Sequence, residues 1–167
     1  MRRARRVSGE RRARPQSAVR IRLALPQDAP HIAAMSRDLI EGGLGWSWTQ
    51  PRVMRSIRDS NTNVAVAYDA AELAAFGIMK YRDEEGHLHL FAVRESHRRR
   101  GIGTELMSWF ERTAVVAGIG VIYLEARVTN GQARAFYAKL GYKEIKIVRG
   151  YYRGVESAVR LAKDLWS

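Results

Sequence analysis

The first patterned segment of the chain alternates apolar with other residues over positions 19–25 and stops at Pro26. This period of two predicts a half-buried strand. The apolar spacing then becomes that of a helix, which Asp28 can cap and which runs to about Ile40. A short second helix begins at Pro51, because proline is favoured in a first helical turn. The buried stripe of the first helix is Ile32, Met35, Leu39 and Ile40.

The period of two returns in three successive strands at 63–68, 73–81 and 87–93, which predict an antiparallel meander. A helical pattern at 101–117 separates the third of these strands from another at 121–128, so these two are expected to be parallel neighbours. A helix that Gly141 ends and a final hairpin complete the pattern, at 132–140 and at 142–148 with 157–162. The predicted fold class is α+β with a mixed sheet.

Composition limits the class of protein. With 167 residues, of which 46% are hydrophobic, the chain can form one core and has little room for two domains. No stretch approaches the roughly 20 apolar residues of a spanning helix, and residues 1–16 lack the apolar section of a secretory signal. The absence of cysteine excludes disulfides, thiolate zinc sites and cysteine nucleophiles. We therefore expect a soluble protein, with the cytoplasm as its default location.

Half of the formal net charge of +12 lies in residues 1–16, where seven arginines stand against Glu10 and give +6. Because this segment is almost without apolar residues, we expect a disordered basic tail outside a domain that occupies residues 17–167. The tail is either a solvated or mis-assigned start of the coding region, or an arm for RNA, the ribosome or another polyanion. An organellar transit peptide is a third alternative.

The segment that follows the third strand of the meander indicates an anion site. It contains the run Arg98-Arg99-Arg100-Gly101-Ile102-Gly103-Thr104. Glycines let the chain turn so that amides at the helix start converge on a phosphate, and the arginines add positive charge, which suits a pyrophosphate. Leu106 stands where a dinucleotide-binding fingerprint has its third glycine, and no Gly-Lys-Ser/Thr follows. Hydride transfer and nucleotide hydrolysis are therefore disfavoured.

The pattern Arg98-x-x-Gly101-x-Gly103 resembles the acetyl-CoA-binding signature of the GNAT acetyltransferase superfamily. The run from Asn130 to Tyr142, with Ala133, Phe136, Tyr137, Leu140 and Gly141, resembles the second signature of that family. The resemblance covers about residues 18–165. It implies the GNAT fold, a mostly antiparallel mixed sheet of about seven strands with a splayed parallel pair in the middle and helices on both faces.

Segments 124–130 and 149–158 resemble the ribosomal-protein alanine N-acetyltransferases and related protein N-terminal acetyltransferases. The chain departs from them at His97, where an aromatic residue such as Tyr is common, and in a longer loop with Trp46 and Trp48. The loop departure bears most on the identity of the acceptor.

The resemblance implies acetyl-CoA as co-substrate. The expected binding positions are Phe91, Ala92, Val93, Arg98, Arg99, Arg100, Gly101, Ile102, Gly103, Thr104, Asn130, Ala133, Phe136 and Tyr137. The backbone of 91–93 would align pantetheine, and the Val93 N–H would stabilise the oxyanion. Tyr137 is the implied general acid that protonates the leaving thiolate. Asn130 would bind the pantetheine arm, or else only cap a helix.

Glu125 is the candidate base, directly or through water, and burial in an apolar strand is expected to raise its proton affinity. The alternative is an ion pair with Arg127 or an edge-exposed carboxylate. At pH 7 an α-amine of pKa about 8 needs about 1.4 kcal/mol for deprotonation and a lysine near 10.4 about 4.6, so one modest base suits an α-amine. Four aromatic residues either wall the acceptor groove or simply pack: Trp46, Trp48, Tyr151 and Tyr152.

We expect an acetyl-CoA-dependent N-acetyltransferase, monomeric or homodimeric, that acts on a protein N-terminus. One alternative is a GNAT enzyme that acetylates a polyamine, an amino acid or an aminoglycoside. Another is a non-catalytic module that binds coenzyme or nucleic acid. His87 and His89 share a strand face, but no third ligand is near them in the sequence, so neither a metal nor a membrane partner is predicted.

Overall fold

The computed structural model describes residues 19–167, so the predicted tail at 1–16 lies outside the described residues. The elements are β1 (Val19–Leu23), a short 3-10 turn (Pro26–Asp28), α1 (Ala29–Leu39), α2 (Gln50–Arg58), β2 (Thr62–Asp69), β3 (Glu72–Arg82), β4 (Glu85–Val93), a second 3-10 turn (Glu95–His97), α3 (Ile102–Val116), β5 (Val121–Arg127), α4 (Gly131–Lys139), β6 (Lys143–Tyr152) and β7 (Glu156–Asp164).

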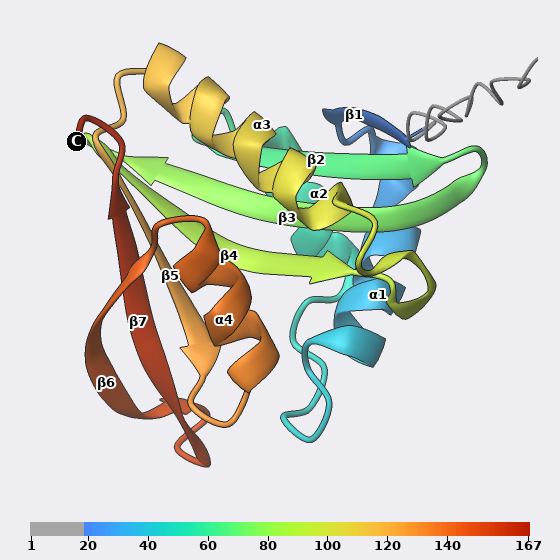
Figure 1. Ribbon diagram of the computed structural model, residues 1–167. Coiled ribbons are helices and arrows are strands. Elements are labelled where there is room, and N and C mark those ends of the chain that lie inside the picture. The colour runs from blue at the N-terminus through green and yellow to red at the C-terminus, as the bar shows by residue number, and fades with distance from the viewer. Residues whose placement is uncertain (1–18) are drawn as a thin grey trace, which may run out of the picture.

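The described strands form one sheet in the order β1-β2-β3-β4-β5-β7-β6. Neighbouring strands are antiparallel except β4 and β5, which are parallel. Helix α3 lies across one face of the sheet, with α4 in front of β5 and β7, while α1 and α2 lie on the opposite face (Figure 1). The predicted mixed sheet, meander and parallel pair are confirmed.

The parallel pair separates part-way along its length. β4 and β5 are in register from Glu85 opposite Val121 to Leu88 opposite Leu124, and no later residues of the two strands pair. Each strand continues on its outer neighbour, β4 on β3 as far as Val93 and β5 on β7. Figure 1 shows the two arrows close together at their origins and far apart at their heads. A gap therefore opens in the middle of the sheet.

Two hydrophobic cores hold the layers together. One core packs α3 and α4 on the sheet and includes the buried Phe110 and Ile122. The other packs α1 and α2 on the opposite face and includes Ile32, Val53 and Phe76. Burial of apolar area stabilises the fold by about 25 cal/mol per Å². Because both faces of the sheet are packed in this way, the helices hold the splayed strands in place.

Three local predictions need correction. Asp28 is the N-cap residue of α1, but its side chain makes no cap hydrogen bond to that helix, because the carboxylate accepts from the Arg22 guanidinium and the Leu25 N–H, both at 2.7 Å, and from the Tyr68 hydroxyl. Leu39 is exposed rather than part of the buried stripe. Strand β1 ends at Leu23 and not at residue 25, because the chain turns there into the 3-10 turn that begins with Pro26.

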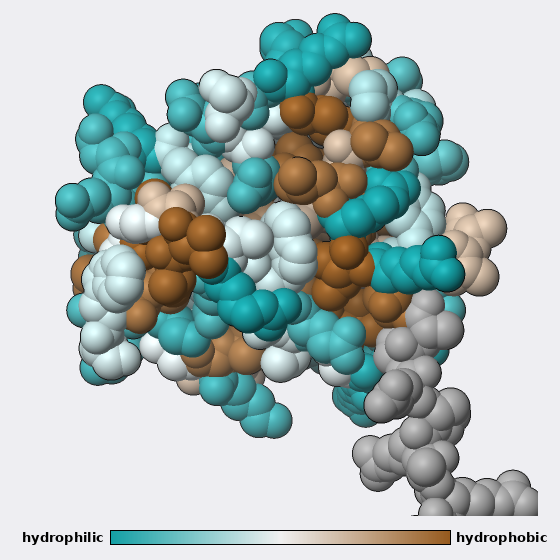
Figure 2. All heavy atoms as spheres, turned by 90° about the horizontal axis from the view of Figure 1, so that it is seen from above, coloured by the Kyte–Doolittle hydropathy of each residue, from teal (hydrophilic) through white to brown (hydrophobic). Residues whose placement is uncertain are grey.

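The face of the molecule seen from above is mixed in polarity. From above, hydrophilic side chains separate the apolar ones into several patches (Figure 2). Among the residues that the structure describes, no helix is both long and apolar enough to cross a membrane.

Candidate functional site

The loop before α3 presents free main-chain N–H groups. Gly101 is the N-cap of α3 with φ +80°, and Arg99 also lies in the left-handed region with φ +62°. Within residues 19–167, no protein acceptor is recorded for the N–H groups of Arg99, Arg100 and Gly101. Left-handed residues beside a helix N-terminus form a concavity of amides that suits a phosphate.

Side chains fix this loop at both of its ends. The buried His97 contacts a carboxylate oxygen of Asp69, at the end of β2, through Nε2 at 3.0 Å. Arg100 reaches the same oxygen at 3.5 Å. Arg98 donates from Nε to the carbonyl of Val93 at 3.1 Å, which ties the loop to the end of β4. These contacts keep the free amides next to the splayed strands.

Gly103 allows three elements to meet. A Cβ there would lie 3.2 Å from Val93 Cγ2 and 3.3 Å from the Phe136 ring, so a side chain would press β4 and α4 away from α3. Phe136 in turn stacks on Phe91 with ring centroids 5.8 Å apart. Of the predicted coenzyme residues, Ala92 and Ile102 are buried in the cores, so only their backbone is available at the surface of the site.

The end of β4 directs its amides into the gap. The Arg94 N–H donates to the Ala74 carbonyl of β3 at 2.7 Å. Because successive residues of a strand send their N–H groups to opposite edges, the N–H of Val93 is directed toward β5, and that of Phe91 likewise. Pairing with β5 has already stopped at Leu88. An oxyanion in the gap therefore has main-chain donors within reach.

A cavity of about 710 Å³ occupies the gap and extends under the loop after α1. Tyr137, Asn130 and Ala133 of the second signature line it, as do Phe91 and Glu125. Asn130 also caps α4, since its side chain accepts from the Ala133 N–H at 3.1 Å. Tyr137 is buried, and this burial, followed by the nearby Tyr152, raises the pKa of its phenol well above the ordinary value. The phenol is therefore protonated at neutral pH.

Glu125 differs from the prediction in its charge state. Its side chain is only 3% exposed, yet His87 Nε2 contacts one carboxylate oxygen at 2.5 Å and Arg160 Nε donates to the other at 2.8 Å. Burial acts to raise the pKa of Glu125, but the contacts with His87 and Arg160 outweigh it and the pKa is lowered. The predicted rise was wrong, and so was the alternative pairing with Arg127, which instead contacts Glu156 at 3.3 Å.

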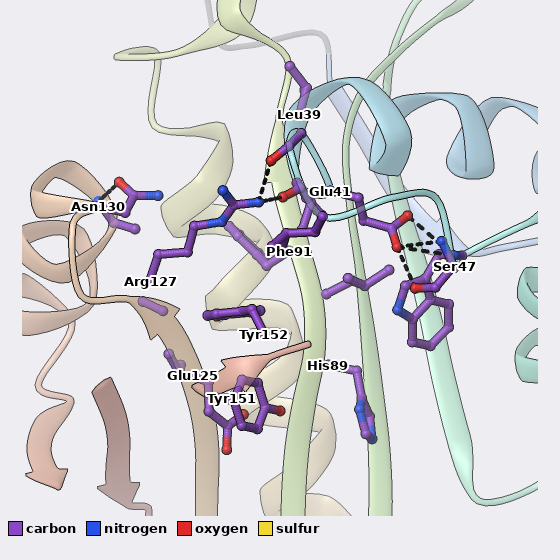
Figure 3. Close-up of a pocket in the computed structure, with 18 of the residues that line it drawn as sticks. Leu39, Glu41, Ser47, His89, Phe91, Glu125, Arg127, Asn130, Tyr151 and Tyr152 are labelled. Atoms are coloured by element: carbon purple, nitrogen blue, oxygen red, sulfur yellow. Dashed lines mark hydrogen bonds between the residues drawn. The ribbon is translucent and has the colours of Figure 1, made fainter. Parts of the chain in front are cut away.

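Three of the four candidate acceptor aromatics line the cavity. Trp48, Tyr151 and Tyr152 do so, and Figure 3 shows both tyrosines between the splayed strands, with Tyr151 beside Glu125. Burial, followed by the charge of Glu125, raises the pKa of Tyr151 to about 12. Trp46 lies outside the cavity lining, 44% exposed, with the Arg37 guanidinium over its ring.

Two residues that the sequence analysis did not select order the wall of the cavity. Glu41, which is 7% exposed, accepts from the N–H groups of Ser47 and Trp48 and from the Ser47 hydroxyl. Arg127 reaches across from β5 and donates to the carbonyls of Ile40 and Gly42, at 2.7 and 2.9 Å (Figure 3). A charged residue between two helices was the only sequence signal for Glu41.

The chain matches the model of the acetyltransferase (GNAT) family over residues 33–142. It belongs to the GNAT family. It is 41% identical over 83 residues to an N-alpha-acetyltransferase of Sulfurisphaera tokodaii and 33% identical over 94 residues to the ribosomal protein bS18-alanine N-acetyltransferase of Escherichia coli. These alignments cover 49% and 54% of this chain, and 50% and 64% of the relatives, so the chain spans about half the length of the first of them.

Solved GNAT structures share the whole fold. Ard1 from Thermoplasma volcanium superposes with a TM-score of 0.78 at 24% identity, over 88% of this chain and 97% of the other. The ribosomal-protein-S18-alanine N-acetyltransferase from Escherichia coli gives 0.76 at 25% identity, over 88% and 94%. PaiA N-acetyltransferase from Thermoplasma acidophilum, solved in complex with coenzyme A, gives 0.75 at 18% identity, over 88% and 99%.

Proposed function

We propose that this protein transfers acetyl from acetyl-CoA to the α-amine of a protein N-terminus. The observation that carries the proposal is the gap between β4 and β5, where one cavity is lined by the Tyr137 phenol and the Glu125 carboxylate and bordered by the free edge of β4. Acyl transfer to an amine needs a proton donor, an oxyanion site and a negative group near the amine, and these are the groups present.

The coenzyme would lie with its diphosphate on the amides at 99–101 and its pantetheine arm along the end of β4. This course brings the thioester into the gap. The neutral amine attacks the thioester carbonyl carbon, and the Val93 N–H stabilises the oxyanion. The C–S bond then breaks as the carbonyl re-forms, and Tyr137 gives its proton to the departing sulfur. The nitrogen loses its extra proton to form the amide, and that proton restores the Tyr137 phenol through water. Burial raises the pKa of the phenol, which keeps it protonated but also makes it a weaker acid, so the role rests on the place of Tyr137 in the cavity lining.

Glu125 does not act as a strong base, because its pKa is lowered and such a carboxylate binds a proton weakly. We assign it to draw the acceptor ammonium into the gap and to receive its proton through water, with His87 on the same carboxylate as the next group in line. The α-amine of a protein fits this weak assistance better than a lysine side chain, because its deprotonation at pH 7 costs about 3 kcal/mol less.

The shape of the acceptor side supports a peptide. Trp48, Tyr151 and Tyr152 line the cavity, and aromatic side chains suit the first residues of a polypeptide. The names of the relatives, N-alpha-acetyltransferase and ribosomal protein bS18-alanine N-acetyltransferase, agree with this choice.

The test is coenzyme A release from acetyl-CoA with peptides that begin with Ala, Ser or Met, set against polyamines, amino acids, aminoglycosides and N-terminally blocked lysine peptides. We expect turnover with at least one free peptide N-terminus, and Tyr137→Phe should lower kcat about 100-fold with little change in acetyl-CoA affinity. Tyr81→Phe is the matched control, since it removes a phenol that bonds to Asn63 away from the cavity. Turnover confined to small amines, or unchanged in Tyr137→Phe, contradicts the proposal.

A further inference from the structure

Three cavities that share lining residues lie next to one another along the sheet. The cavity in the gap shares Trp48, Arg52 and His89 with a second one of about 260 Å³ beside α2. It shares His89 and Glu125 with a third one of about 670 Å³ over the first halves of β4 and β5. His89 lines all three. The cavity in the gap is therefore flanked by two further hollows along the sheet.

The third cavity is a basic trough, defined by Lys80 and Arg82 of β3, Lys146 of β6 and Arg160 of β7. Its carboxylates are Glu125, which Arg160 and His87 already neutralise, and Glu85. Within the described residues, neither Arg82 nor Lys146 has a salt-bridge partner, and Lys80 has only Asp59 at 4.0 Å. The second cavity adds Arg52 and Arg55 at its edge. Positive charge in these two cavities thus exceeds the negative charge available to balance it.

We infer that the basic trough binds acidic residues of the acceptor polypeptide that lie several positions after its acetylated N-terminus. This inference rests on the proposed function, because it takes the N-terminus to lie in the gap. Like-charged groups in a concave surface concentrate an oppositely charged partner. The floor of the trough is sheet, and Ile145 contributes an apolar wall, which suits an extended peptide.

The distance sets which residues of the acceptor reach the trough. Glu125 lies where the cavity in the gap meets the trough, and Arg82 lies at the far end of the trough. Arg82 pairs with Glu85, and Glu85 pairs with Val121, which is four residues before Glu125 on β5. At about 3.3 Å per residue this is roughly 13 Å, the length of about four residues of extended peptide. The acidic residues should therefore stand near positions 5 to 8 of the acceptor.

RNA is the other polyanion that a basic surface attracts. The peptide is favoured because the trough adjoins the acceptor cavity and shares His89 and Glu125 with it, so a chain whose N-terminus lies in the gap can pass over the trough. A nucleic acid would have no reason to bind beside the gap in the sheet, whereas an acceptor peptide must extend from it.

The test uses the full-length protein and labelled ten-residue peptides with one N-terminal sequence and either four Glu or four Gln at positions 5 to 8. Fluorescence anisotropy gives Kd and steady-state assays give KM and kcat, at about 50 mM and about 300 mM salt. We expect the Glu peptide to bind at least ten-fold more tightly at low salt, with a matching fall in KM, similar kcat and a smaller difference at high salt.

The double variant Arg82→Glu with Lys146→Glu should remove or reverse this preference, while its affinity for the Gln peptide stays within about two-fold. Lys139→Glu is the control for charge, because Lys139 is exposed on α4 and lines none of these cavities. Retained thermal stability shows that the double variant is folded. If that variant does not fold, Arg82→Gln and Lys146→Gln are measured singly, each with an expected partial loss of preference.

Three outcomes overturn the inference: equal Kd for the Glu and Gln peptides, a preference that survives the double variant, or displacement of the Glu peptide by a single-stranded RNA oligonucleotide at lower concentration than by unlabelled peptide. A protein that acetylates no peptide contradicts the proposed function instead. The anisotropy measurement still decides the inference in that case.

Discussion

At the scale of residues, the protonation state of each ionisable group in the site depends on the side chains that contact it. Glu125 is buried, which alone would favour its neutral form, but two nitrogen-bearing side chains on β4 and β7 hold it as a carboxylate. Tyr137 has no such partner, so burial acts unopposed and keeps its phenol protonated. One cavity thus contains a stable anion and a stable proton donor.

Replacing Glu125 with Gln should destabilise the fold and slow the reaction. The change leaves the partly buried Arg160 and His87 facing a neutral amide, so we expect a loss of about 2 kcal/mol and at least ten-fold in kcat/KM. Thermal melts across pH check the charge state. Because the pKa of Glu125 is lowered in the fold, its stabilising effect is present above its usual pKa of 4.5 and is lost only as pH falls further.

Glu144→Gln is the control for that experiment. Glu144 is also bound by an arginine, Arg134 at 2.7 Å, but on the surface of the molecule and away from the cavity. It should melt close to the unchanged protein and retain activity. A Glu125→Gln protein as stable as Glu144→Gln at pH 7 would show that the carboxylate is not held as described.

At the scale of elements, α3 uses glycine at both ends for different purposes. Gly101 has φ +80° at the N-terminal end and Gly118 has φ +82° after the C-terminal end, and a Cβ at either would meet no atom within 4 Å. A substitution at Gly101 and one at Gly118 should therefore strain the backbone to the same extent. Only the N-terminal end presents free amides beside the splayed strands, and this makes the pair a matched test of the phosphate site.

Gly101→Ala and Gly118→Ala should each cost about 1 kcal/mol of stability, because a Cβ strains the left-handed backbone. Only Gly101→Ala should weaken acetyl-CoA binding, by about ten-fold, since relief of the strain turns the amides at 99–101 away from the diphosphate. Calorimetric titration with acetyl-CoA measures both affinities. Equal affinity in the two variants would place the diphosphate elsewhere.

At the scale of the whole molecule, the proposed function assigns the two reactants to different parts of the sheet. The loop proposed to bind the diphosphate leads into α3, whereas the cavities proposed for the acceptor are lined by the loop after α1, by α2 and by β3, β4, β5 and β7. The gap between β4 and β5 joins these two parts. Reactants bound in them can therefore meet in the gap without either crossing a core.

Removal of residues 1–16 should weaken the binding of RNA and leave catalysis unchanged. It takes away +6 of the formal +12, so binding to a single-stranded RNA oligonucleotide at low salt should weaken at least ten-fold and become less dependent on salt. Melting temperature and turnover of a short neutral peptide should stay the same, because the site lies within the described residues. Unchanged RNA binding after the truncation would refute the role of these residues as a polyanion arm.

The sequence by itself determined the strands, the helices and the family, because apolar periodicity and glycine spacing are local properties of the chain. It also selected Tyr137, Asn130 and the loop at 98–104, since these lie within continuous signatures. The folded structure decided the charge of Glu125, whose partners lie 38 and 35 residues away along the chain. It likewise placed Glu41 in the cavity wall and Trp46 outside it. Contacts between strands distant in sequence leave no periodic trace, so only the assembled sheet could define the electrostatics of the site and its basic trough.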